Sequence, residues 1–475
     1  MRVRVAVGFL PFAALVVLVS CARDPGGPPE FTLPSDAGSL TGDAGNLVGN
    51  GNTDGHPCFN LECLQVDCAS HQQPDTTISG VVYDPAGARP LYNVVVYVPN
   101  GPVQPLKSGV VCDQCGVLAS GLPLVSTLTG PDGHFVLHDV PVSDDVPLVL
   151  QLGKWRRQLV VPHVSACADT AMLDPTAMRL PARQSEGDMP QIAIATGGCD
   201  AFECLLQKIG IDPAEFTNEN GGGRVHLYQG GGGATLSSPT APASSLWGSP
   251  NIGTYDLVLN ACECSEAADE KPQSSIDNLV TYANAGGRVF NTHYQYYWID
   301  PTKVADRPVV ATNAAWQSTA SFIPEVQGTT TIDGNVDTSF PKGAAFAEWL
   351  VNVGATRAKG QFPIAEARYN AIAATPPSTQ WVGDPNLGQT ETGNNALLHY
   401  TFNTPVGAQP ADQCGKVLFS DFHVVGATSD YVPFPQECET GPLTPQELAL
   451  EFMLFDLSAC IQPDKDPPRP PQTTQ

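Results

Sequence analysis

Two histidines in this chain occupy positions where catalytic or metal-binding side chains are often found. His293 and His423 are each predicted to stand at the end of an apolar segment with the composition of a buried strand. Imidazole changes charge near neutral pH, binds divalent metals and transfers protons as a general acid or base. With the carboxylates of Asp421 and Glu263, this set could bind a divalent metal or act as acid and base on a sugar. The alternative is that each histidine only hydrogen-bonds a loop.

Aromatic residues follow the first of these histidines directly. Tyr294, Tyr296, Tyr297 and Trp298 form a dense cluster beside His293. Aromatic faces of this kind stack on sugar rings, but large aromatic side chains also fill protein cores. The cluster therefore predicts either a sugar platform or a core beneath the segment that follows it.

Shared chemistry of His293 and His423 has a geometric condition. The ligands of one metal ion lie about 2 Å from it, so two histidines that act together must be close in space. A separation above about 10 Å, or burial of both side chains, would exclude shared chemistry.

The elements that must position these residues alternate between strand and helix. Apolar segments at 191–196, 225–228, 255–260 and 288–293 have strand character, and helical spacing is found at 201–209 and 274–285. Such alternation predicts an open parallel α/β sheet of the flavodoxin or amidotransferase kind. Ligands of these sheets collect at the carboxyl ends of the strands, where both histidines are expected.

This α/β segment resembles a known superfamily. The stretches YDLVLNACEC and IDNLVTYANAGGRVFNTHYQYYW, and the late strand GKVLFSDFH at 415–423, are similar to the glutamine-amidotransferase-like proteins, especially their ThuA-like branch. The resemblance covers 191–460, with an unmatched insertion at 301–413. It implies a nucleophilic cysteine on a strained elbow after the fourth strand, yet Thr292-His293-Tyr294 stands there. Because Cys262 and Cys264 lie one strand earlier and are expected to pair, glutaminase activity is not expected.

A second module precedes the α/β segment. Short β-rich runs and an Asp-Gly turn at 132–133 predict a small antiparallel β-sandwich within 58–180. The runs ISGVVYDPAGARPLYNVVVYVPNG and STLTGPDGHFVLHDVP resemble the carboxypeptidase regulatory-like (transthyretin-like) domain, with a cysteine-bearing insertion at 106–123. That domain has no catalytic residues of its own, and the HxxE zinc motif of a carboxypeptidase is missing from the chain. The resemblance implies a spacer or binding module.

The amino terminus has the pattern of an export signal. Arg2 and Arg4 precede an apolar run that is too short to span a bilayer, and Leu18-Val19-Ser20-Cys21 resembles the bacterial lipobox. We therefore expect a lipoprotein signal peptide at 1–20 and lipidation of Cys21. Residue 22 is alanine rather than aspartate, which favours the outer membrane or cell surface. Residues 21–57 read as a disordered tether, and 461–475 as a disordered Pro-rich tail.

Thirteen further cysteines fit an oxidising compartment. Outside the cytoplasm they are candidates for disulfides, and because the number is odd at least one is left over. The spacing Cys112-x-x-Cys115 also fits zinc or redox motifs, but no second pair has the spacing that structural zinc requires. No metal site and no cofactor is predicted. The disulfide candidates are Cys58, Cys63, Cys68, Cys112, Cys115, Cys167, Cys199, Cys204, Cys262, Cys264, Cys414, Cys438 and Cys460.

The charge balance narrows the range of partners. The formal net charge is −25, which argues against nucleic acid and against docking on anionic lipid headgroups. Two functions remain. The first is a non-catalytic, lipid-anchored surface protein that binds a glycan or protein partner. The second is a hydrolase of extracytoplasmic sugar or amide substrates that uses His293 and His423.

Overall fold

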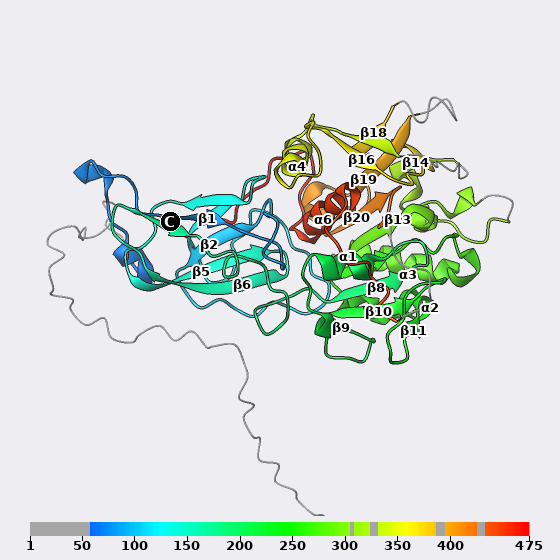
Figure 1. The fold of residues 1–475 in the computed structure, drawn as a ribbon, viewed down its shortest axis with the longest axis horizontal. Coiled ribbons are helices and arrows are strands. Elements are labelled where there is room, and N and C mark those ends of the chain that lie inside the picture. Colours follow the sequence, from blue (N-terminus) through cyan, green and yellow to red (C-terminus); the bar gives the residue numbers. More distant parts are fainter. Residues whose placement is uncertain (1–57, 305–307, 324–330, 386–394, 425–432, 475) are drawn as a thin grey trace, which may run out of the picture. The chain divides into compact units, whose positions relative to one another are not determined.

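The computed structural model describes residues 58–304, 308–323, 331–385, 395–424 and 433–474 (Figure 1). The predicted signal peptide, Cys21 and the predicted tether lie outside these residues. Within them, the chain forms a β-sandwich and an α/β module.

The sandwich is made of two small sheets (Figure 1). One has the order β4-β1-β7, from His134–Leu137, Thr77–Val81 and Asp169–Met172, and the other has the order β3-β2-β5-β6, from Pro123–Leu128, Val95–Pro99, Asp144–Leu152 and Trp155–His163. The prediction of a purely antiparallel sandwich is wrong in one pair, since β1 and β7 run parallel. After β6 the chain crosses to the other sheet, where the disulfide Cys68–Cys167 ties the start of β7 to the segment before β1.

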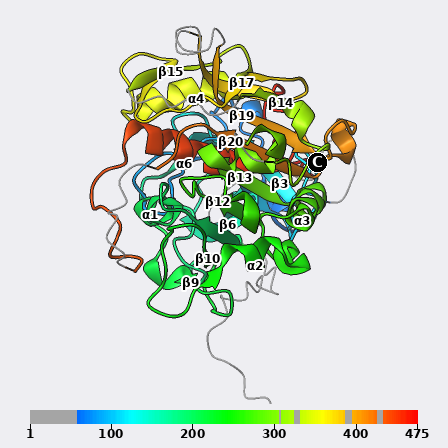
Figure 2. The ribbon, with the colours of Figure 1, turned by 90° about the vertical axis from the view of Figure 1, so that its right-hand side faces the viewer.

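The α/β module contains one mixed sheet of eleven strands (Figure 2). Its parallel part has the order β11-β10-β8-β12-β13-β20, from Ala241–Pro242, Val225–Gln229, Ile192–Thr196, Leu257–Asn260, Arg288–Thr292 and Gly415–Ser420; β9 (Phe216–Thr217) also pairs with β10. The sheet then continues antiparallel through β19, β18, β15 and β16, from Ala396–Thr404, Thr379–Asp384, Ile332–Val336 and Gln361–Ile364. The expected insertion 301–413 is thus an integral part of the sheet, and the expectation of a purely parallel sheet is wrong.

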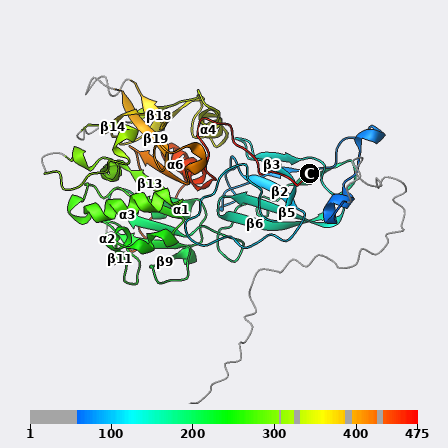
Figure 3. The same ribbon diagram turned by 180° about the vertical axis from the view of Figure 1, so that it is seen from behind.

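Helices cover both faces of this sheet, because its strands are apolar on both sides. Ile194, Leu259 and Phe290 belong to the core shared with α1 (Phe202–Lys208), α4 (Pro341–Asn352) and α6 (Pro445–Ser458). Their neighbours on the strands, such as Ala195, Val258 and Val289, belong to the core with α2 (Ala243–Trp247) and α3 (Gln273–Asn284), which pack side by side (Figure 3). A separate pair joins β14 (Ala320–Phe322) to β17 (Ala371–Ala374).

Short 3-10 helices connect several of these elements. They are η1 (Asn60–Leu64), η2 (Ala69–His71), η3 (Pro213–Glu215), η4 (Pro250–Thr254), η5 (Ala268–Glu270), η6 (His293–Trp298), η7 (Pro301–Lys303), η8 (Gln317–Thr319) and η9 (Pro410–Asp412).

Helix α6 connects the cores of the two modules. It begins with the capping box that its sequence predicts: Thr444 Oγ1 accepts from the backbone N–H of Glu447, whose carboxylate accepts from the N–H of Thr444. Phe452 then stacks on Tyr92 of the sandwich, with ring centroids 5.8 Å apart. Residues 446–458 are all buried, which is the pattern of a helix enclosed on every side.

Six disulfides crosslink the described residues. Four join residues of the same module: Cys58–Cys63 and Cys68–Cys167 in the sandwich region, and Cys199–Cys264 and Cys204–Cys438 in the α/β module. Cys204–Cys438 fastens α1 to the segment before α6. Cys112–Cys414 and Cys115–Cys460 join the sandwich insertion to the α/β module. Cys262 is free, so the expectation of an unpaired cysteine is confirmed, whereas the expected Cys262–Cys264 pair is wrong.

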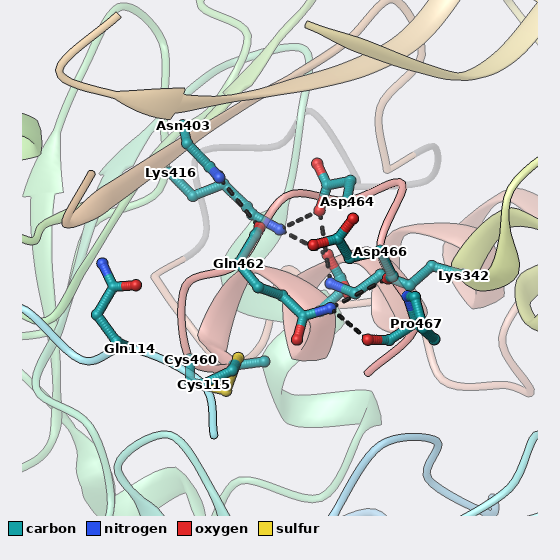
Figure 4. Close-up of a disulfide and its surroundings, with 12 residues drawn as sticks. Gln114, Cys115, Lys342, Asn403, Lys416, Cys460, Gln462, Asp464, Asp466 and Pro467 are labelled. Atoms are coloured by element: carbon teal, nitrogen blue, oxygen red, sulfur yellow. Dashed lines mark hydrogen bonds and ion pairs between the residues drawn. A yellow bond between two sulfur atoms is a disulfide. The ribbon is translucent and has the colours of Figure 1, made fainter. Parts of the chain in front are cut away.

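The carboxyl-terminal segment 461–474 is ordered, so the prediction of an unstructured tail is wrong for these residues. Directly after the Cys115–Cys460 disulfide, the side chain of Gln462 bonds the carbonyls of Asp466 and Pro467, and Asp464 is buried against Lys416 (Figure 4). Further along, Thr474 donates to the carbonyl of Pro123 at the start of β3. The proline-rich tail has few large apolar side chains that could anchor it in a core. The Cys115–Cys460 disulfide and buried polar contacts anchor it instead.

Candidate functional site

The site begins at a strained turn after β13. His293 follows Thr292 directly and has φ of +47°, in the left-handed region that non-glycine residues rarely adopt. A residue held there costs of order 1–3 kcal/mol, and such strain gathers at functional sites. His293 therefore stands on a sharp, strained turn at the end of a central strand of the sheet.

A thiol reaches this imidazole from the neighbouring strand. Cys262 lies just beyond β12, and its Sγ is 3.0 Å from Nδ1 of His293. Burial raises the pKa of the Cys262 thiol to about 12. Burial, together with Arg368 and His423, holds the pKa of His293 well below its usual range. At neutral pH both groups are therefore uncharged, and the contact is a hydrogen bond between a thiol and a neutral imidazole, with no thiolate–imidazolium pair.

The second histidine lies beside the first. The rings of His293 and His423 are 5.9 Å apart, and Nδ1 of His423 lies 3.0 Å from the carbonyl of Val424. Asp200 joins the two strand ends, since its carboxylate accepts from Thr292 Oγ1 at 2.5 Å and from the N–H of Val424 at 3.0 Å. Burial raises the pKa of Asp200, and the nearby His423 opposes that shift.

Access to this cluster is closed. His293 is 0 % exposed, His423 is 6 % exposed and Cys262 is 0 % exposed. The two histidines meet the distance condition for shared chemistry but not the exposure condition, because both are buried. The arrangement shown here can hold protons and hydrogen bonds internally, and it does not present a reactive atom to a substrate.

The two predicted carboxylates have other partners. Asp421 is buried at the end of β20, where Oδ2 accepts from the N–H of Ala371 and its own carbonyl accepts from the N–H of Arg368. Glu263 accepts from the N–H of Gly231, from Gln295 and from the ammonium of Lys271.

The glycine run 230–233 fits closely around the Glu263 carboxylate. A Cβ at Gly230 would lie 2.3 Å from the carbonyl of Thr196 and 2.8 Å from Oε1 of Glu263, so no larger residue fits there. These glycines therefore hold a protein carboxylate in place.

The aromatic cluster divides between site and core. Tyr294 packs on His293 with ring centroids 4.1 Å apart, and Nη1 of Arg368 donates to its hydroxyl at 3.0 Å. Trp298 points away from the histidines into the core, where its ring lies 4.8 Å from that of Trp247 and its Nε1 donates to Gln295. Of the predicted aromatic residues, only Tyr294 belongs to the site.

Three members of the site were not found from sequence. They are Asp200, for which the sequence indicates no role in a site, Cys262, which is predicted as a disulfide partner, and Arg368, which lies within the unmatched insertion 301–413. The available signal was the position of Asp200 and Cys262, which follow the parallel strands β8 and β12 and so belong to the same sheet edge as the histidines. No comparable signal marks Arg368.

Among the described residues, one grouping has the ligand types and spacing of a metal site: Cys204, Glu437 and Cys438. Its two sulfur atoms form a disulfide 2.04 Å long and so are not available as thiolate ligands. The residues present there do not fit a bound metal in this oxidised form.

Comparison with known proteins gives only distant likenesses. No family model and no curated protein matches this chain. Among solved structures, it is similar to a protein from Bacteroides uniformis described as ThuA-like, with 10% identity and a TM-score of 0.30 over 55% of this chain and 88% of that one. It is also similar to a cohesin–X-dockerin complex from Acetivibrio cellulolyticus, with 14% identity and a TM-score of 0.15 over 30% of this chain and 75% of that one. At these TM-scores neither likeness carries an argument about function.

Proposed function

We propose that this chain is an extracytoplasmic, lipid-anchored surface protein that binds a glycan or protein partner without converting it. The observation that carries the proposal is the closure of the cluster that His293 and His423 form with Cys262. Cys262, His293 and His423 are buried, and burial raises the pKa of the thiol to about 12. Because the thiol and both imidazoles of this cluster are buried, the cluster favours recognition over turnover.

The proposed location rests on the cysteines and on the amino-terminal pattern. Six disulfides in the described residues indicate an extracytoplasmic protein, because such bonds persist in oxidising compartments. None of the described helices is long and apolar enough to cross a bilayer. Attachment through a lipid on Cys21, with alanine at position 22, then supports the outer membrane or cell surface.

The sandwich supports a role in recognition. Its resemblance to carboxypeptidase regulatory-like domains implies a module without catalytic residues of its own. Its core continues into that of the α/β module through Phe455, whose ring is 6.0 Å from that of Trp155. Two disulfides also join the modules covalently.

Binding and turnover are separated by one set of measurements on the purified mature chain. Glycan arrays and cell-surface binding are compared for the wild type, His293→Ala and His423→Ala, while hydrolysis of sugar esters and amides is followed in parallel. The proposal predicts binding that both variants keep, with no turnover by any of the three. Turnover by the wild type that either substitution abolishes would contradict it.

One observation favours a second candidate, a hydrolase. The thiol of Cys262 and the ring of His293 are in hydrogen-bond contact, and the His423 ring lies beside them. This function requires the cluster to open on substrate binding, because His293 and His423 are both buried here and cannot share chemistry in the closed form. A substrate-dependent rate that falls in His423→Ala but not in a matched surface variant, His138→Ala, would support this function.

A further inference from the structure

The outer face of one sandwich sheet carries two aliphatic side chains where water would normally meet polar ones. Val95 of β2 stands directly opposite Leu128 of β3 and Gln151 of β5 in the strand register. The neighbouring residues Val96 and Leu150 point into the sandwich core, so Val95 and Leu128 point outward. Antiparallel sheets usually place polar side chains on such a face.

A loop and part of the carboxyl-terminal tail, together called the roof, lie over this face and leave a cavity between themselves and the sheet. The loop 113–120 and the tail residues Arg469 and Pro471 line a cavity of about 190 Å³, whose floor includes Val95 and Leu128. The roof is fixed: the Cys115–Cys460 disulfide lines the cavity, and isolated bridges pair Gln114 with Ile461 and Leu118 with Gln472. Figure 4 shows this disulfide beside Gln114, where the tail begins.

The lining selects the chemistry of an occupant. Aliphatic side chains form its largest group, beside the uncharged polar side chains of Asn93, Gln114, Ser120 and Gln151. No aromatic ring is among them, so the sugar-stacking platform of glycan sites is missing among these residues. The charged groups at its edge have protein partners: Arg469 is paired with Asp466, and Asp113 lies in the field of Arg288 and Lys154. An apolar cavity of about 150 Å³ is large enough to bind benzene.

We propose that this cavity binds a small uncharged aliphatic molecule of about six to eight carbon atoms. This site is separate from the cluster around His293 and does not depend on the proposed partner binding. Val117 and Leu118 of the roof are 51 % and 47 % exposed, which gives the rim an apolar surface next to the space. The sheet on one side and the disulfide-linked roof on the other keep the cavity formed before the ligand arrives. A cavity that is already formed lowers the entropy cost of binding.

Calorimetric titration of the full mature chain tests the site, with cyclohexanol and 1-hexanol as probes and hexanoate, hexylammonium and glucose as comparators. The wild type is expected to bind the two alcohols and to bind the comparators at least about tenfold more weakly, because a charge or a set of hydroxyls must be desolvated. Absence of alcohol binding at millimolar concentration would overturn the proposal. Equal or tighter binding of glucose would also overturn it.

Variants then locate the bound alcohol. Leu128→Trp fills the cavity, and the matched control Leu173→Trp makes the same change at a side chain that is 84 % exposed. Leu128→Trp should weaken alcohol binding at least about tenfold, which corresponds to two methylene groups excluded from the site, and Leu173→Trp should not. Val95→Phe repeats the test from the facing strand should Leu128→Trp not fold. Unchanged binding in a folded cavity-filling variant would show that the alcohols bind elsewhere.

Discussion

Removing one of the two disulfides between the modules should destabilise the chain by an amount set by connectivity. Cys112 and Cys414 are 302 residues apart, but Cys115–Cys460 stays closed three residues from Cys112 and 46 residues from Cys414. The ring that Cys112–Cys414 closes is therefore about 50 residues, and the loop-entropy model gives about 4 kcal/mol for it instead of about 6 for the full separation.

The assay is guanidinium unfolding of Cys112→Ser combined with Cys414→Ser, without reductant, followed by tryptophan fluorescence. The matched control removes Cys58–Cys63, whose five-residue loop predicts a loss of about 2 kcal/mol. Removing both intermodule disulfides should cost about 9 kcal/mol in total. Once Cys112–Cys414 is gone, Cys115–Cys460 closes a ring of more than 100 residues that runs through Cys204–Cys438, so its loss costs more than the first. A loss for Cys112–Cys414 no larger than that of the control would refute the reasoning.

Four further predictions follow, three on buried charged groups and one on a helix cap. Lys416→Met should cost about 3–5 kcal/mol in chemical unfolding, because it removes one of two ammonium partners from the buried Asp456. Burial would raise the pKa of Asp456, but Lys342 and Lys416 lower it to about 2. The stability that the ionised Asp456 contributes is therefore present above pH 3.8 and is lost as pH falls through about 2. A pH series of unfolding midpoints checks this. Burial raises the pKa of Glu437 to about 7. The stability contributed by the protonated Glu437 is therefore present below pH 4.5 and is lost as pH rises through 7. Glu437→Gln should flatten that part of the same series of unfolding midpoints. Thr444→Ala should lower the free energy of unfolding by about 1 kcal/mol, because it removes the side-chain oxygen that caps α6.

Features that depend on residues close together in the sequence were predictable. The capping box at Thr444 and the strands before His293 and His423 follow from spacing within a few residues, and the structure has them. The structure also has left-handed backbone at His293, directly after β13.

Long-range features were not predictable in the same way. The partner of Cys264 is Cys199, which depends on which two strand ends meet at the sheet edge. Arg368 enters the site because β14 and β17 form a separate pair near it, and nothing in its own neighbourhood marks it. The tail lacks the apolar residues that predict packing, and it is ordered by the Cys115–Cys460 bond and by Asp464, whose burial depends on Lys416 of a distant strand.

The accessibility of Cys262 in the native protein tests the central claim most directly. The mature chain is treated with iodoacetamide at neutral pH before and after unfolding without reductant, and alkylated cysteines are mapped by mass spectrometry. A sealed, non-catalytic cluster predicts no modification of Cys262 in the native state and modification of this one described cysteine after unfolding. Rapid alkylation of Cys262 in the native state, suppressed by His293→Ala, would contradict the account, because it would show an open site with an activated thiol.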